Sequence, residues 1–146
     1  MTVHDLPPQL AAIRDDFLAL EERDRLMLLL EFSNYLPELP ERYREHTDLF
    51  ERVEECQSPV YIFVEIDENR AVHIFATAPR ESPTTRGFVS IIAQGLDGLT
   101  VEQALDVPDD FPDSIGLRAA VSPLRLRGMS AMLARTKRQL RERAPR

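Results

Sequence analysis

Apolar and polar residues follow a helical period over the first part of the chain. Apolar side chains recur every three or four positions after the proline pair at residues 7–8, which predicts a helix that begins there. A second helix is predicted over residues 22–35, and its run LMLLL is apolar around much of the circumference. We therefore expect this second helix to be deeply buried. Pro37 and Pro40 end it, because proline cannot continue a helix.

The pattern then changes to a period of two, which is typical of strands. Residues 60–66 alternate along their length, and residues 71–77 repeat the alternation after the turn sequence DEN at 67–69. Two strands so close in sequence are predicted to pair as an antiparallel hairpin. A short strand at 52–54 is predicted just before them, which gives about three strands in all.

The remainder of the chain returns to a helical pattern. One helix is predicted from Pro83 to about residue 98, and Thr100 with Gln103 forms the signature of a capping box for a second. Residues 108–114 are predicted to form a proline-punctuated loop. Ser122 then precedes a long final helix, whose apolar face comprises Met129, Met132, Leu133, Thr136 and Leu140.

Helices on both sides of a small hairpin predict an α+β fold. Specifically, we expect two layers, with a small antiparallel sheet of about three strands packed against helices. A length of 146 residues fits one domain that spans 1–146.

Charge is unevenly distributed along the chain. Residues 1–117 carry 24 acidic and nine basic side chains, whereas residues 118–146 carry nine basic and one acidic, for a net charge of −7. The acidic body argues against nucleic-acid binding, for which a basic surface is expected. The basic end is better explained as a helix terminus that complements its own dipole and the acidic body.

Neither a membrane segment nor a secretion signal is evident. The longest apolar run has five residues, at 26–30, and the first ten residues lack the basic start and apolar stretch of a signal peptide. A single cysteine forms no internal disulfide and suits a reducing compartment. We therefore expect a cytoplasmic protein with no membrane partner.

Resident metal and phosphate sites are also not expected. The three histidines, His4, His46 and His73, lie far apart in sequence, and with one thiol they offer no ligand spacing. The five glycines form no phosphate-binding pattern. The expectation is therefore no metal and no cofactor.

The only cysteine, Cys56, is predicted to lie on a loop. It is followed by Gln57 and Ser58, which are poor core residues, and by Pro59, which favours a turn or the start of a strand. Functional groups concentrate on loops. The pattern leaves two interpretations open: a functional thiol, or an inert small apolar side chain.

The neighbours of Cys56 make it a weak nucleophile on its own. Glu54 and Glu55 oppose formation of the thiolate, whereas Arg52 favours it. This setting is more typical of a passive acceptor than of a self-sufficient catalyst. A hydrolase that pairs Cys56 with His73 is conceivable only if the fold brings the imidazole to the thiol.

Three ordered motifs resemble a known family. They are ECQSPVYIFVEI around Cys56, TTRGFVSII with Arg86 and Gly87, and VSPLRLRGMSAML in the C-terminal part, and the segment LPELP also matches. Together they are similar to the SufE family, the sulfur-acceptor proteins of the SUF iron–sulfur cluster assembly system. Two positions depart from many members, which have glycine at Glu55 and glutamine at Pro59.

The resemblance implies a SufE/NifU-like fold and a role in sulfur transfer. Cys56 would accept persulfide sulfur from a SufS-type cysteine desulfurase and pass it to the SUF scaffold, with the pyridoxal phosphate on the desulfurase. Gln57, Ser58 and Arg125 are the implied supporting residues. The protein would then be an accessory factor, not an enzyme, and a monomer or a homodimer.

The resemblance leaves one alternative and one structural expectation. The alternative is a binding module that docks on a desulfurase or scaffold without carrying sulfur. A sulfur carrier should hold the Cys56 loop at the edge of the molecule, with the resting thiol sheltered by apolar neighbours.

Overall fold

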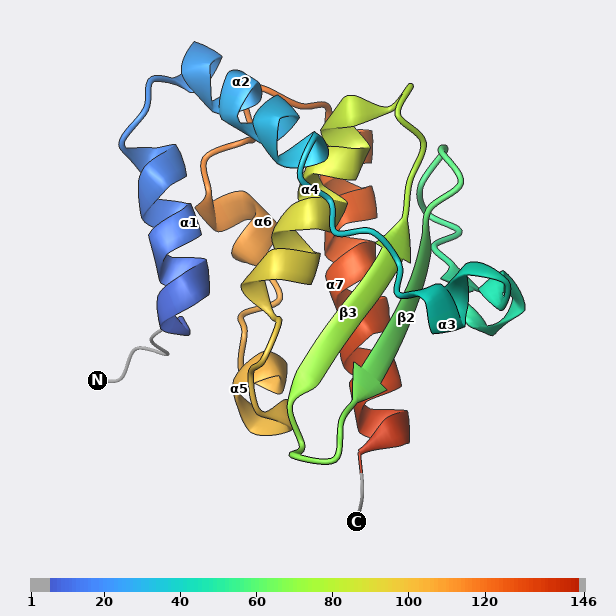
Figure 1. Ribbon diagram of the computed structural model, residues 1–146. Coiled ribbons are helices and arrows are strands. Elements are labelled where there is room, and N and C mark those ends of the chain that lie inside the picture. The colour runs from blue at the N-terminus through green and yellow to red at the C-terminus, as the bar shows by residue number, and fades with distance from the viewer. Residues whose placement is uncertain (1–5, 145–146) are drawn as a thin grey trace.

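The computed structural model describes residues 6–144 and has an α+β fold, as predicted (Figure 1). Residues 1–5, which include His4, and residues 145–146 lie outside the described residues. The elements, in chain order, are α1 (Pro8–Leu18), α2 (Glu22–Ser33), α3 (Glu41–Arg44), the 3-10 helix η1 (Thr47–Leu49), β1 (Glu51–Arg52), β2 (Tyr61–Ile66), β3 (Val72–Thr77), α4 (Pro83–Gly95), α5 (Val101–Leu105), α6 (Phe111–Ser114) and α7 (Pro123–Arg143).

The predicted hairpin forms the centre of a three-stranded antiparallel sheet. β2 pairs with β3 in a register that places Val64 opposite Ile74, and β1 pairs with the other side of β2. The turn between β2 and β3 is held by Asp67, whose carboxylate accepts hydrogen bonds from the backbone of Asn69 and Ala71. The first strand is shorter than the predicted 52–54 and begins one residue earlier, because the chain turns away after Arg52 towards Cys56.

The two faces of the sheet are covered differently. The alternating apolar residues of β2 and β3 point to one face, where α7 packs on β2 and α4 packs on β3 (Figure 1). On the opposite face, Phe63 pairs with Phe75, and Tyr43 packs against both rings. The period of two in the sequence therefore separates a helix-covered face from an aromatic one.

Helices α2 and α4 contact each other closely enough to require glycine. A Cβ atom at Gly87 would lie 2.2 Å from the carbonyl oxygen of Leu29, so only a residue without a side chain allows this approach. The prediction that α2 is deeply buried is wrong: Leu29 is buried, but Met27 is 61% exposed. The helix lies on the outside of α4, so only one stripe of its apolar surface is covered (Figure 1).

The C-terminal part confirms the predicted caps and corrects one loop. Thr100 and Gln103 form both hydrogen bonds of a capping box at α5, and Ser122 caps α7 through the backbone N–H of Arg125. The predicted face of α7 is buried throughout. Residues 108–114 are not entirely a loop, because Phe111 and Pro112 turn inward and begin the short helix α6.

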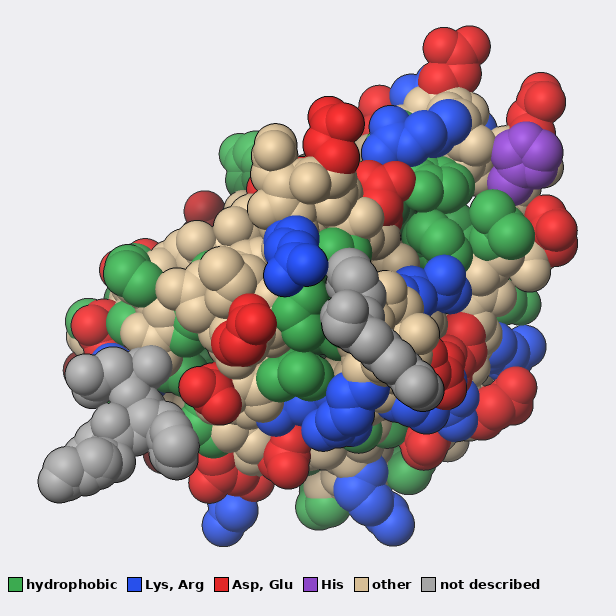
Figure 2. All heavy atoms as spheres, turned by 90° about the horizontal axis from the view of Figure 1, so that it is seen from below, with side chains coloured by type: hydrophobic (Ala, Val, Ile, Leu, Met, Phe, Trp, Pro, Cys, Tyr) green, Lys and Arg blue, Asp and Glu red, His purple; other side chains and the backbone are tan. Residues whose placement is uncertain are grey.

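The basic C-terminal helix pairs with the acidic body, as expected from its charge. Arg135 and Arg138 both form ion pairs with Glu51, and the buried Lys137 pairs with Asp109. Figure 2 shows the face at the C-terminal end of α7, where basic and acidic side chains are interspersed. Among residues 6–144, the helices lack the length and apolarity needed to cross a bilayer.

Candidate functional site

The candidate site is built on the loop between β1 and β2, residues 53–60, which we call the cysteine loop. The backbone N–H of Val53 donates to the carbonyl of Val60 at 2.9 Å, so the base of the loop is closed. Within it, the N–H of Cys56 donates to the carbonyl of Val53 at 3.1 Å and forms a turn. The prediction that Cys56 lies on a loop is therefore confirmed.

The thiol of Cys56 turns inward and packs under helix α7. The residue is 8% exposed and belongs to the hydrophobic core, and its Sγ lies 3.9 Å from the carbonyl oxygen of Gly128. A Cβ atom at position 128 would lie 3.1 Å from this sulfur. Glycine at 128 thus provides the space that the resting thiol occupies, and the predicted shelter of the thiol is present.

Burial makes the resting thiol hard to ionise. It raises the pKa of Cys56 to about 11, with a further contribution from the negative charge of Glu55 and a smaller opposing one from Arg135. At pH 7 about one molecule in ten thousand would carry the thiolate at that pKa. Because the thiolate is the nucleophile, the resting position is a protected one.

Arg135 fixes the cysteine loop from outside. Its guanidinium pairs with Glu55 at 2.8 Å and with Glu51 at 2.5 Å, and it donates to the carbonyl of Arg52 at 3.3 Å. These contacts hold the pKa of the Glu55 carboxyl below its usual value. The loop residue next to Cys56 is therefore anchored to the same helix that covers the sulfur.

Ser58 ties the other end of the loop to helix α4. Its hydroxyl lies 2.6 Å from the hydroxyl of Ser82, the N-cap residue of α4. Gln57 is exposed. Arg125 is also exposed in the first turn of α7, and only its backbone N–H takes part in the cap. The functions expected for the Gln57, Ser58 and Arg125 side chains stay predictions.

The sequence had not pointed to Arg135 as part of the site. Two features hinted at it: the acidic Glu55 in place of glycine, and the excess of basic side chains in the C-terminal helix. Nothing local could join them, because Arg135 and Glu55 are 80 residues apart in the chain.

His73 does not pair with Cys56. Its Nδ1 lies 2.7 Å from Asp97 and its Nε2 lies 2.8 Å from Asp67, so carboxylates occupy both ring nitrogens. In the sheet, His73 lies opposite Glu65, four positions along β2 from the end that joins the cysteine loop, or roughly 13 Å. The structure therefore contradicts the Cys–His hydrolase interpretation.

Metal-binding groups do not gather in the described part of the chain. Within residues 6–144, no cluster of three or more His, Cys, Asp or Glu side chains could hold a metal ion. The chemistry that the site offers is that of one sheltered thiol, an ion pair beside it, and a loop anchored at two points.

Comparison with known proteins assigns the chain to a family. The family described as "SufE: Fe-S metabolism associated domain" matches residues 11–140. The chain belongs to the SufE family. This membership places the protein in iron–sulfur metabolism and agrees with the fold described above.

Relatives of this SufE-family chain are found in several organisms. A SufE-like protein of Mycobacterium tuberculosis, described as uncharacterized, is 51% identical over 94% of each chain. SufE-like protein 1, chloroplastic/mitochondrial, of Arabidopsis thaliana is 28% identical over 90% of this chain and 34% of the longer plant protein. The solution structure of a hypothetical protein from Thermus thermophilus superposes with a TM-score of 0.82, at 33% identity, over 94% of this chain and 97% of that one.

Proposed function

We propose that this protein accepts sulfur from a SufS-type cysteine desulfurase on Cys56 and delivers it to the scaffold that builds iron–sulfur clusters. Membership of the SufE family supports the context. In the transfer step, the Cys56 thiolate attacks the outer sulfur of the desulfurase persulfide. A new S–S bond forms on Cys56, the old S–S bond breaks, and the desulfurase cysteine leaves as a thiolate. No external oxidant or reductant is needed.

One observation carries this role. The only cysteine of the chain lies on a loop, with its sulfur sheltered under α7 and its pKa raised to about 11. Such a thiol resists oxidation and random exchange at rest, because both reactions need an accessible thiolate. A persulfide returned to the same shelter would be protected in the same way.

Transfer then requires the cysteine loop to open. The loop must release two contacts, the ion pair between Glu55 and Arg135 and the hydrogen bond between Ser58 and Ser82. Once the sulfur reaches water, its pKa falls towards the ordinary value, and the proton passes to solvent or to a base of the partner. Docking of the desulfurase would favour the open loop if its surface binds that form more tightly.

In this proposal the protein is an accessory factor and the desulfurase is the enzyme. Pyridoxal phosphate stays on the desulfurase. A reducing compartment such as the cytoplasm would keep Cys56 available as a thiol. Gln57 and Ser58 would shape the open loop, and Arg125 would contact the desulfurase or the sulfur anion.

The test compares the native chain with Cys56→Ser and Cys56→Ala. Each protein is incubated with a SufS-type desulfurase and cysteine, and sulfide release is measured alongside the intact mass. We expect the native chain to stimulate sulfide release and to gain the mass of one sulfur atom, and both variants to do neither.

Thermal unfolding of the two variants serves as the control for folding. Equal stimulation by Cys56→Ser would contradict the acceptor role. Tight binding to the desulfurase with no mass gain on the native chain would favour the alternative, a docking module that carries no sulfur.

A further inference from the structure

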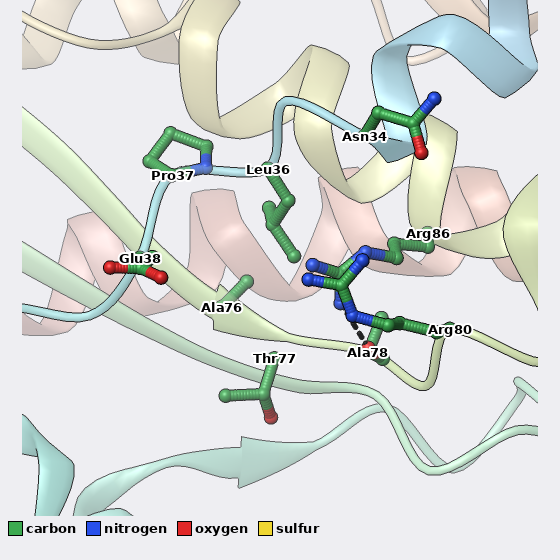
Figure 3. Close-up of a pocket in the computed structure, with 9 residues that line it drawn as sticks. All are labelled: Asn34, Leu36, Pro37, Glu38, Ala76, Thr77, Ala78, Arg80 and Arg86. Atoms are coloured by element: carbon green, nitrogen blue, oxygen red, sulfur yellow. Dashed lines mark hydrogen bonds between the residues drawn. The ribbon is translucent and has the colours of Figure 1, made fainter.

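Away from the cysteine loop, a pocket lies next to the connection between β3 and α4 (Figure 3). It has a volume of about 240 Å³. The residues that line it are Asn34, Leu36, Pro37, Glu38, Ala76, Thr77, Ala78, Arg80 and Arg86. Two of these are arginines, and Figure 3 shows their guanidinium groups side by side at one end of the pocket.

Arg86 is held rigidly in this pocket by backbone carbonyls. Its Nε donates to the carbonyl of Ser33 at 2.9 Å, and its Nη1 donates to the carbonyl of Ala78 at 2.5 Å. Neutral carbonyls position the group but do not neutralise its charge. Of the five N–H donors of a guanidinium, these two bonds leave three for another acceptor.

Arg80 adds a second positive charge instead of a compensating negative one. Among residues 6–144, neither arginine forms an ion pair with a carboxylate within 4.0 Å. Glu38, the one acidic side chain of the lining, lies at the other end of the pocket, away from both guanidinium groups (Figure 3). Partial burial and the charge of Arg80 together lower the pKa of Arg86.

We propose that the two guanidinium groups of Arg80 and Arg86 bind an oxyanion. An anion between them would remove the repulsion of two like charges and accept charge-assisted hydrogen bonds from both. Arg86 is already fixed in place, so little side-chain freedom would be lost on its side. Arg80 is exposed and closes on the ligand from the rim.

The position of this pocket links it to the cysteine loop. Arg80 lies two residues before Ser82, whose hydroxyl is bonded to Ser58 of that loop. The oxyanion could therefore come from either of two sources. One is a free anion such as inorganic phosphate; the other is a carboxylate of the desulfurase that docks over the loop. The second source rests on the proposed function, whereas the first does not.

The first experiment titrates the protein with inorganic phosphate and follows thermal unfolding, with sodium chloride at equal ionic strength as the reference. Arg80→Gln is compared with the native chain, because replacing Arg86 would break its bonds to Ser33 and Ala78. Arg23→Gln is the matched control. Arg23 is exposed and lies eleven residues from Asn34, at the opposite end of α2, about 17 Å away.

For a free anion, phosphate should raise the melting temperature of the native chain and of Arg23→Gln beyond the effect of chloride. Arg80→Gln should bind phosphate at least about tenfold more weakly, since it lacks one charged donor group. Without phosphate, Arg80→Gln should be no less stable than the native chain, because a repulsive charge has been removed. A merely structural role for Arg80 would predict a loss of stability instead.

The second experiment measures the affinity of the same three proteins for the desulfurase. For a partner carboxylate, Arg80→Gln should bind about tenfold more weakly, while Arg23→Gln should bind normally. Cys56→Ser should bind the desulfurase with native affinity, because it leaves Arg80 and Arg86 unchanged. Failure of sulfur transfer and failure of the anion pocket therefore give different results. If Arg80→Gln matches Arg23→Gln in both experiments, the oxyanion site is refuted.

Discussion

The shelter of the thiol can be tested by adding one methyl group to helix α7. In Gly128→Ala, the new Cβ would lie 3.1 Å from the Cys56 sulfur, which is tighter than ordinary van der Waals contact. The Cα atom of Cys56 and the carbonyl oxygen of Glu55 would both lie 3.9 Å from the new Cβ, so the backbone needs no shift. The sulfur is therefore the atom that must move. We expect the resting thiol to be displaced towards solvent.

The size of the effect follows from the pKa of Cys56. At pH 8, a thiol with a pKa of about 11 is about one part in a thousand thiolate, whereas one at the ordinary 9.0 is about one part in ten. Full release would thus raise the thiolate fraction about a hundredfold. The less basic thiolate is about tenfold less nucleophilic, for a Brønsted coefficient of about 0.5. For full release, which is the upper limit, the net gain in rate is about tenfold, before any gain from access.

The assay is the rate at which the protein reacts with a neutral aromatic disulfide at pH 8. Ser130→Ala is the matched control, because it changes an exposed residue of the same helix. Alanine favours the helix over glycine by about 1 kcal/mol, so Gly128→Ala should remain folded. If Gly128→Ala is folded and reacts at the native rate, α7 does not confine the thiol and the reasoning fails.

Three further predictions concern the loop, the core and the pH dependence of stability. Arg135→Gln should free the cysteine loop by removing the ion pair with Glu55. The variant should react severalfold faster with the disulfide, and its free energy of unfolding, measured by chemical denaturation, should fall by about 1 kcal/mol. An unchanged reaction rate would contradict this. Gly87→Ala should lower the free energy of unfolding by roughly 2 kcal/mol or more, and the melting temperature with it, because its Cβ would meet the Leu29 carbonyl at 2.2 Å. A native melting temperature would exclude this close approach. Folding raises the pKa of Cys56, so the protonated thiol contributes stability that is fully present below about pH 9 and is lost as the pH rises to about 11. Relative to Cys56→Ala, the native chain should lose up to about 2 kcal/mol of unfolding free energy over this window. Parallel profiles of stability against pH for the two proteins would be the contrary result.

The main strands and the long helices of this protein follow from its amino-acid sequence alone. The period of two over residues 60–66 and 71–77 predicted the hairpin, and the spacing of Met129, Met132 and Leu133 predicted the buried face of α7. These predictions succeeded because backbone periodicity and caps depend on residues at most a few positions apart. Placement of Cys56 on a loop followed in the same way, from its immediate neighbours.

The behaviour of that thiol, in contrast, depends on how distant segments pack. Gly128 lies over Cys56 from 72 residues away, and Arg135 reaches Glu55 across 80 residues. The exposure of Met27 also depends on which side of α2 meets α4. Burial and charge act through space, so the pKa of a thiol and the cover of a helix are set by contacts between segments far apart in the chain, which local patterns do not encode.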